Sequence, residues 1–163
     1  MKELMFLRHA KSSWENQVED RNRGLTEKGI RRIKAMAKAS KTIFDPFEIV
    51  FSSPANRALH TACILMYETQ RPFDQLHVRE ELYTFDLSNV IQFVKSLPES
   101  YSKVICVGHN PAFTSVVSVL TQSDLYHLPT AAWVKIQFKQ DHWGEIHDGS
   151  LSLGMPNEIL KST

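Results

Sequence analysis

The chain has 163 residues, of which 42% are hydrophobic and 23% charged, and its formal net charge is +1. This length suits one domain with a sizeable core, and the small net charge excludes a general attraction to nucleic acid or to an anionic membrane. No apolar run reaches the roughly 20 residues of a transmembrane helix, and the N-terminus lacks a signal-peptide pattern, so we expect a cytoplasmic protein. The two cysteines, Cys63 and Cys106, lie in apolar stretches that favour buried thiols in a reducing compartment over a disulfide.

Strand and helix patterns alternate along the first half of the chain. Residues 4–8 form an apolar run that predicts a buried strand. Residues 25–43 follow with apolar side chains at helical spacing behind Thr26, a suitable N-cap. A second strand pattern at 47–53 leads into a helix over 54–69, which we expect to carry Pro54 in its first turn.

The second half continues this alternation. The predicted segments are a short strand within 75–82, a helix within 87–100 that is capped by Ser88 and stops before Pro98, a strand at 102–109, a helix at 110–122, and a hairpin-type pair of strands at 131–139 and 142–149. Continuous apolar strands that alternate with amphipathic helices favour a mostly parallel sheet covered on both faces. We therefore predict an α/β fold, a three-layer α/β/α sandwich with a mostly parallel central sheet, formed by one domain over residues 1–163.

Polar side chains gather where the predicted strands end. Arg8 and His9 follow the first strand, Arg57 lies just after the second, and His109 follows the fourth. Because ligands of open α/β sheets bind at the carboxyl ends of the strands, we expect these four side chains to meet in one pocket. The N-termini of the two following helices would add N–H donors and positive dipole ends. Guanidinium groups bind phosphate in a bidentate way, so phosphate is the expected ligand.

Three motifs carry a family resemblance: LRHAKS at 7–12, SSPANRALHTA at 52–62 and VGHNP at 107–111. In this order they resemble the histidine phosphatase superfamily, also called phosphoglycerate mutase-like, and in particular its SixA-like branch of short phosphohistidine phosphatases. The resemblance extends over nearly the whole chain and implies the phosphoglycerate mutase-like fold.

The resemblance also implies a role for each pocket residue. His9 matches the family's nucleophile, which accepts the phosphoryl group and becomes phosphohistidine. Arg8 and Arg57 match the two arginines of the phosphate pocket, and His109 matches the second histidine that contacts the phosphate. These roles suit phosphoryl transfer, in which positioned cations stabilise the charge on the equatorial oxygens. We expect neither a metal nor a cofactor, since the arginines supply the charge and no metal-ligand spacing occurs.

The remaining site residues are less clearly marked. We assign the proton donor to Glu81, which lies just past the third strand, with Glu80 as the alternative. A third alternative is that no acid is needed, because the P–N bond of a phosphohistidine substrate is weak. Ser12 and Asn110 are further candidates for contacting the phosphate.

We therefore expect a phosphatase that forms a phosphohistidine intermediate on His9 and acts on phosphohistidine or another phosphorylated protein side chain. Two alternatives stay open: a small-molecule phosphomonoesterase or mutase-type enzyme, and a non-catalytic phosphate-binding module. The short stretch between Glu81 and Lys103 is filled by one predicted helix and leaves little chain for a lid, which favours a protein substrate. We expect a monomer that binds neither nucleic acid nor membrane.

Other residues receive structural interpretations. The basic run at 21–32 is expected to be a solvated loop and helix face, with a place on the pocket rim as the alternative. No motif surrounds His127. Core or hairpin packing is expected for the aromatic residues, although Trp14 is close enough to His9 to line the mouth of the pocket; these residues are Trp14, Phe85, Trp133 and Trp143.

Overall fold

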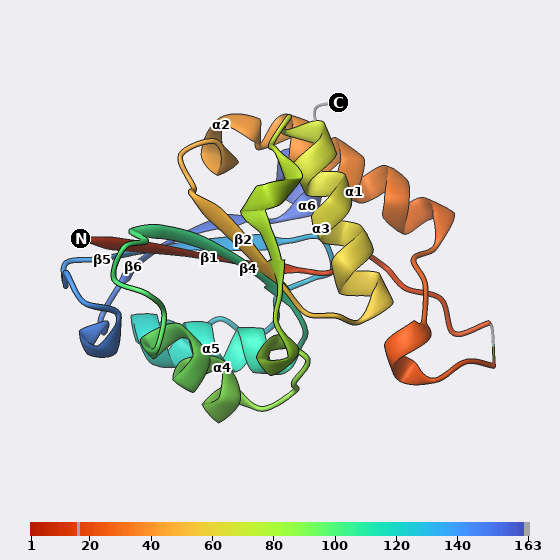
Figure 1. Ribbon diagram of the computed structural model, residues 1–163. Helices are drawn as coiled ribbons and strands as arrows, with labels where there is room; N and C mark the ends of the chain where they lie inside the picture. Colours follow the sequence, from red (N-terminus) through yellow and green to blue (C-terminus); the bar gives the residue numbers. More distant parts are fainter. Residues whose placement is uncertain (16, 162–163) are drawn as a thin grey trace.

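The computed structural model describes residues 1–15 and 17–161, which build one six-stranded sheet with helices on both faces (Figure 1). The strands are β1 (Lys2–Arg8), β2 (Ile49–Ser52), β3 (Leu76–Val78), β4 (Lys103–Gly108), β5 (Trp133–Phe138) and β6 (Ser150–Gly154). The α-helices are α1 (Glu27–Ala39), α2 (Lys41–Phe44), α3 (Asn56–Glu68), α4 (Leu87–Lys95), α5 (Ala112–Thr121) and α6 (Pro156–Ile159). Short 3₁₀ turns are η1 (Asp20–Asn22), η2 (Phe73–Gln75), η3 (Glu80–Leu82) and η4 (Trp143–Glu145).

The sheet has the strand order β3-β2-β4-β1-β5-β6. Strands β3, β2, β4 and β1 run parallel to one another, while β5 is antiparallel to β1 and β6 is antiparallel to β5. Figure 1 shows α1, α2, α3 and α6 on one face of the sheet and α4 and α5 on the other. This arrangement confirms the predicted three-layer α/β/α sandwich with a mostly parallel sheet.

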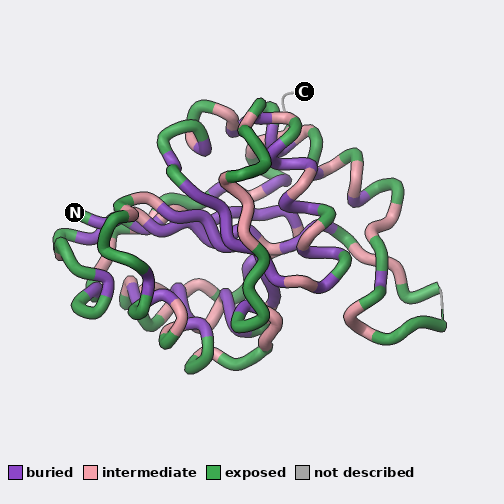
Figure 2. The backbone as a smooth tube through the Cα atoms, viewed as in Figure 1, coloured by how far each residue is buried: buried purple, intermediate pink, exposed green. Residues whose placement is uncertain are grey.

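Strand β1 shows why the sheet sits between two cores. Leu4 and Phe6 belong to the core under α4 and α5, whereas Met5 and Leu7 belong to the core under α1 and α3. Successive side chains of a strand point to opposite faces, and all four are fully buried. Each contributes ~1.5–3 kcal/mol by leaving water. Figure 2 shows the buried strands in the middle of the molecule, with exposed backbone in the outer loops and helix faces.

The loop after β1 is fixed by the start of α1. The Thr26 side chain accepts a hydrogen bond from the Gly29 N–H (2.9 Å), as predicted for the N-cap, and the Thr26 N–H donates to the Lys11 carbonyl (2.9 Å). A Cβ atom on Gly29 would lie 2.4 Å from the same carbonyl oxygen, so only glycine allows this close approach. The N-terminus of α1 thereby holds the segment that follows Arg8 and His9.

Two helix starts differ from the prediction. Helix α3 begins at Asn56 with Ala55 as N-cap, so Pro54 lies before the helix and not in its first turn. Helix α4 is capped by Asp86, because its carboxylate accepts the Ser88 N–H at 2.9 Å, which leaves Ser88 inside the helix.

The prediction of a strand at 142–149 is wrong, and the partner of β5 is β6, Ser150–Gly154. The reason is Trp143, which is fully buried and whose indole N–H donates to the Tyr101 carbonyl (2.9 Å). This anchor holds the segment in the turn η4 beside the core. The antiparallel pairing itself is confirmed, one segment later in the chain.

Candidate active site

The four predicted pocket residues, Arg8, His9, Arg57 and His109, line one cavity of about 430 Å³ at the carboxyl ends of β1, β2 and β4. They come from three separate parts of the chain, as expected from the parallel strand order. Arg8 is half-buried and the other three are buried. The same cavity is lined by Ser12, Asn110 and Lys11 of the quoted motifs, and by Asp20 and Arg23, which no sequence motif marks.

His9 is held in one tautomer. Its Nδ1 lies 2.7 Å from the Ala10 carbonyl oxygen, which can only accept, so Nδ1 carries the hydrogen. In the neutral ring, Nε2 therefore keeps its lone pair. The backbone is fixed as well: the His9 N–H donates to the Gly108 carbonyl (3.1 Å), and the Ala10 N–H donates to Thr61 Oγ1 (2.9 Å). The ring is thus held on a fixed stretch of backbone, with the lone pair of Nε2 available.

The surroundings of His9 keep it uncharged. Burial lowers the pKa of the imidazole to about 4, against the raising effect of the Ala10 carbonyl, and the positive charges of Arg57, Arg8 and Arg23 act in the same direction as burial. At neutral pH the ring is therefore in the form that can attack phosphorus.

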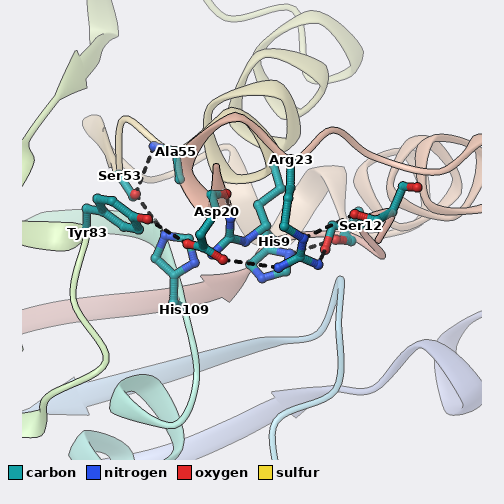
Figure 3. A network of polar contacts seen from close by, with 11 residues as sticks. His9, Ser12, Asp20, Arg23, Ser53, Ala55, Tyr83 and His109 are labelled. Carbon is teal, nitrogen blue, oxygen red and sulfur yellow. Dashed lines mark hydrogen bonds and ion pairs between the residues drawn. The ribbon is translucent and has the colours of Figure 1, made fainter. Parts of the chain in front are cut away.

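His109 presents a buried nitrogen without a partner. Its Nε2 lies 2.8 Å from Ser53 Oγ, and that oxygen already accepts the Ala55 N–H at 3.2 Å (Figure 3). Among the described residues, the Ser53 hydroxyl has no other acceptor for its hydrogen, so it donates to His109 Nε2, and the neutral ring then carries its own hydrogen on Nδ1. Burial lowers the pKa of His109 to about 3, with the neighbouring His9 and Arg57 adding to the effect. Among the described residues, the buried Nδ1 has no hydrogen-bond partner, although buried polar atoms are almost always satisfied.

The two arginines are positioned by carbonyl and carboxylate oxygens. Arg57, only 2% exposed, donates through Nη1 to the Asp20 carbonyl (2.7 Å) and through Nη2 to the Asp20 carboxylate (3.0 Å). Arg8 Nη1 donates to the Leu128 carbonyl (3.0 Å) and lies 3.3 Å from His127 Nε2. Arg8 Nε is buried with no partner among the described residues. Like His109 Nδ1, it is a donor that an anion in the cavity would satisfy.

Asp20, on η1, connects most of the site. Its carboxylate accepts hydrogen bonds from the Tyr83 hydroxyl (2.6 Å), Arg57 (3.0 Å) and Arg23 (3.3 Å), as Figure 3 shows for Tyr83 and Arg23. Burial tends to raise the pKa of Asp20, but the hydrogen bonds and the Arg57 charge outweigh it and lower the pKa to about 2. Asp20 is therefore an anion at neutral pH. It holds the guanidinium groups and has no proton to donate.

Arg23 corrects the expectation that the basic run at 21–32 is simply solvated. Its side chain is buried, donates through Nε to the Ser13 carbonyl (3.1 Å) and through Nη2 to Ser12 Oγ (2.6 Å), and lines the cavity. For Arg23, the alternative prediction of a place at the pocket is therefore the correct one. Arg21 lies nearer the surface and forms an ion pair with Glu80.

Ser12 and Asn110 lie in the cavity as predicted, yet both have structural partners. Ser12 Oγ accepts the hydrogen bond from Arg23, as just described. The Asn110 side chain donates to the Leu128 carbonyl (2.9 Å) and accepts the Thr114 N–H (3.1 Å). Asn110 therefore ties the start of α5 to the segment that positions Arg8.

The structure does not bring Glu81 to this cavity. Glu81 is exposed and lines a neighbouring cavity of about 560 Å³ between η3 and α4, together with Glu80. The turn η3 directs Leu82 into the core, where it is fully buried, and leaves both glutamates on the outside. Asp20 is the one carboxylate that lines the cavity of His9 among the described residues.

Two features are absent from residues 1–15 and 17–161. No group of three or more His, Cys, Asp or Glu side chains is arranged to hold a metal ion. No helix in these ranges is long and apolar enough to cross a membrane.

The free energy of unfolding is expected to fall as the pH is lowered from about 6.5 towards 4, because both pocket histidines have pKa values below the roughly 6.5 of an unfolded chain. In this window the unfolded chain binds more protons, so stability rises with pH and reaches its full value above about 6.5. Urea unfolding across this range measures the slope. A variant with His9→Gln and His109→Gln is expected to have a shallower slope, and an unchanged slope would contradict the assignment.

Comparison with known proteins points to one family. The sequence matches the family described as "Histidine phosphatase superfamily (branch 1)" over residues 4–89, which is more than half of the chain. An uncharacterised protein of Mycobacterium leprae is 28% identical over 121 residues, which cover 72% of each chain.

Solved structures agree on the fold. The protein histidine phosphatase SixA, solved in complex with tungstate, superposes with a TM-score of 0.80 at 21% identity and covers 96% of this chain and 99% of its own. A mycobacterial glucosyl-3-phosphoglycerate phosphatase, in complex with VO₃, superposes with a TM-score of 0.70 at 16% identity and covers 95% and 99%. At these identities the likeness establishes the fold, and the substrates named for the two structures differ in kind.

Proposed function

Since the chain belongs to the histidine phosphatase superfamily and is thus a phosphatase with a histidine nucleophile, we propose that His9 is this nucleophile and that the substrate is a phosphohistidine side chain of another protein. The nucleophile assignment rests on the tautomer and charge of His9, which leave Nε2 with a free lone pair in the cavity. The phosphate site rests on the two buried donors, Arg8 Nε and His109 Nδ1, that have no partner among the described residues.

The proposed reaction has two steps. His9 Nε2 attacks phosphorus, the bond from phosphorus to the leaving nitrogen breaks, and its electron pair goes to that nitrogen, which takes a proton from water. Water then attacks the phosphoryl group on His9, loses a proton, and returns the N–P electron pair to Nε2, which releases inorganic phosphate. In both steps Arg8, Arg57 and the His109 Nδ1–H stabilise charge on the phosphoryl oxygens.

The observation that favours phosphohistidine is the nature of Asp20. It is the carboxylate in the cavity, and its pKa of about 2 leaves it without a proton at neutral pH. An alkyl phosphate releases a strongly basic alkoxide and needs a positioned acid. A phosphohistidine releases an imidazole, which takes its proton from water and needs little help from a positioned acid. The cavity is therefore suited to a leaving group that departs readily.

The shape of the site supports a protein substrate. Residues 83–102 are all described, and α4 is the one helix among them, so beyond Phe85 at the cavity mouth this stretch supplies little chain for a lid. We further propose that residues 1–163 act as one monomeric phosphatase domain without a cofactor. An open cavity admits a side chain that projects from a folded partner.

The leaving group is expected to decide the rate. We predict that kcat/KM is highest for a phosphohistidine protein, lower for an activated aryl phosphate, and at least about 10²-fold lower for an alkyl or sugar phosphate, the usual worth of a missing acid. A turnover screen across these substrates measures the order. Faster turnover of a sugar phosphate than of phosphohistidine would instead support the small-molecule phosphomonoesterase or mutase-type alternative.

Glu81→Gln provides the matched control for this screen. If Glu81 were the acid, the substitution would slow alkyl phosphates by about 10² to 10⁴ and spare phosphohistidine. Because Glu81 lies in the neighbouring cavity, we expect a ratio near unity for every leaving group. Absence of turnover on all substrates would indicate the non-catalytic phosphate-binding module.

A further inference from the structure

We propose that Trp14 and Phe85 form an aromatic mouth that selects phosphoryl compounds whose leaving group is a planar ring; this inference rests on the phosphatase activity proposed above. Both side chains line the cavity that contains His9 and His109. They come from separate segments, Trp14 from the loop after β1 and Phe85 from the turn between η3 and α4. Phe85 departs from the packing expected for it, and Trp14 lines the mouth, which was the alternative given for it. Trp133 and Trp143 are buried as predicted.

Trp14 is both exposed and fixed. It is 77% exposed, yet the Arg23 guanidinium carbon lies 3.2 Å from the centre of its ring. Arg23 itself is buried and held by Ser12, Ser13 and Asp20. One face of the indole is therefore covered by a rigid planar cation, and the large exposed fraction leaves the rest of the ring open to the cavity and solvent. Stacking on arginine also limits the entropy that the indole would lose when a ligand binds.

Phe85 is fixed in a similar way from the side of the second histidine. It is 51% exposed, and its ring centre lies 5.7 Å from that of His109 and 6.1 Å from that of Tyr83, both edge-on. Tyr83 is in turn hydrogen-bonded to Asp20. Each ring of the aromatic mouth is thus supported by a residue of the phosphate site, and each keeps an open surface beside it.

A ring attached directly to the phosphoryl group would reach these surfaces while the phosphate lies between the arginines. Aromatic rings prefer offset or edge-on contacts at this range, and such contacts add affinity beyond the burial of apolar area. Imidazole and phenol rings share this geometry, whereas the flexible carbon chain of a serine or sugar phosphate does not. The chemical class is therefore an aryl or imidazolyl phosphoryl group.

Binding of two phosphonates separates this proposal from the activity itself, because neither compound is hydrolysed. Phenylphosphonate is expected to bind about tenfold more tightly than methylphosphonate, a typical gain from stacking. Calorimetry gives both Kd values for every variant, and the change in tryptophan emission on binding checks them in the wild type, because Trp14 is the tryptophan that lines the cavity. Trp14→Ala and Phe85→Ala are expected to raise the Kd of phenylphosphonate towards that of methylphosphonate and to leave the Kd of methylphosphonate unchanged.

The controls determine which idea fails. Tyr67→Ala removes an aromatic side chain that is also 74% exposed but lies in the last turn of α3, at the opposite end from Arg57, and should change neither Kd. Trp14→Phe keeps an aromatic ring and should retain most of the difference between the Kd values of the two phosphonates. Equal affinity for the two phosphonates in the wild type would overturn the aromatic mouth and leave the phosphatase proposal standing. No binding of either would overturn both.

Rates of turnover test whether the aromatic mouth acts on phenyl and on imidazole leaving groups alike. Phenyl phosphate and a fluorinated alkyl phosphate can be matched in leaving-group pKa while only the first carries a planar aromatic ring, and we expect about a tenfold advantage in kcat/KM for phenyl phosphate. The advantage should disappear in Trp14→Ala. For a phosphoimidazole substrate, kcat/KM should fall by the same factor in Trp14→Ala. If it does not fall, the aromatic mouth does not contribute to phosphohistidine hydrolysis.

Discussion

Replacement of His9 by alanine is expected to lower kcat by at least about 10⁴-fold on every substrate, because no covalent intermediate can form without Nε2. The substitution leaves the cations in place, so the variant should still bind phosphate. Steady-state kinetics on phosphohistidine and aryl phosphate measure the loss, and calorimetry with inorganic phosphate measures the retained binding.

A trapping experiment tests the same nucleophile directly. Rapid quenching of the wild type with radioactive substrate is expected to leave label on His9 as an acid-labile, base-stable phosphoramidate. The variant His109→Gln keeps His9. It should form the labelled intermediate more slowly than the wild type, and the label should still be on His9. Label on any other residue, or full activity in His9→Ala, would exclude the assignment.

Replacement of Arg57 by alanine is expected to reduce kcat/KM by about 10³-fold, the range found when a positioned cation is removed from phosphoryl transfer. Two effects act together. The cavity loses a buried guanidinium, and Asp20 loses the partner that binds both its carbonyl and its carboxylate (2.7 and 3.0 Å). The carboxylate, which keeps only its hydrogen bonds from Tyr83 and Arg23, would then repel a phosphate dianion more strongly.

Two further variants separate these effects. Arg57→Lys keeps a positive charge but not the two-pronged contact, so it should recover only part of the loss. Arg57→Ala combined with Asp20→Asn removes the repulsion and should be more active than Arg57→Ala alone. Urea unfolding is needed for each variant to confirm the fold, and a kcat/KM for Arg57→Ala within tenfold of the wild type would argue against its place in the reaction.

The parts of the site that were predictable follow from strand ends. Arg8, His9 and His109 stand directly after apolar runs, so a parallel sheet brings them together whatever the details of the loops. Arg57 lies in the first turn of the helix that follows the second strand. These positions depend on chain order and on strand direction, and both are readable from the pattern of apolar residues.

The parts that were not predictable depend on loop geometry. Asp20 and Arg23 lie in a stretch without periodicity, and only the fold of that loop over the start of α3 brings them to Arg57 and Ser12. Glu81 was predicted to lie in the His9 cavity because it follows the third strand. The 3₁₀ turn η3 directs its side chain into the neighbouring cavity instead. The strand expected at 142–149 failed for a similar reason, since burial of Trp143 outweighed the strand propensity of its neighbours.

The position of β1 in the middle of the sheet has a consequence for synthesis. Its neighbours are β4 and β5, and Arg8 exchanges backbone hydrogen bonds with Ala131 and Ala132 (both 3.1 Å). His9 is therefore synthesised before both strands that enclose it, because β4 begins at Lys103 and β5 at Trp133. At about 5–20 residues per second, the pocket around His9 stays unassembled for roughly ten seconds until β5 has been made. Pairing across such long stretches of chain is slow, so catalytic competence should arise only after β5 has docked beside β1.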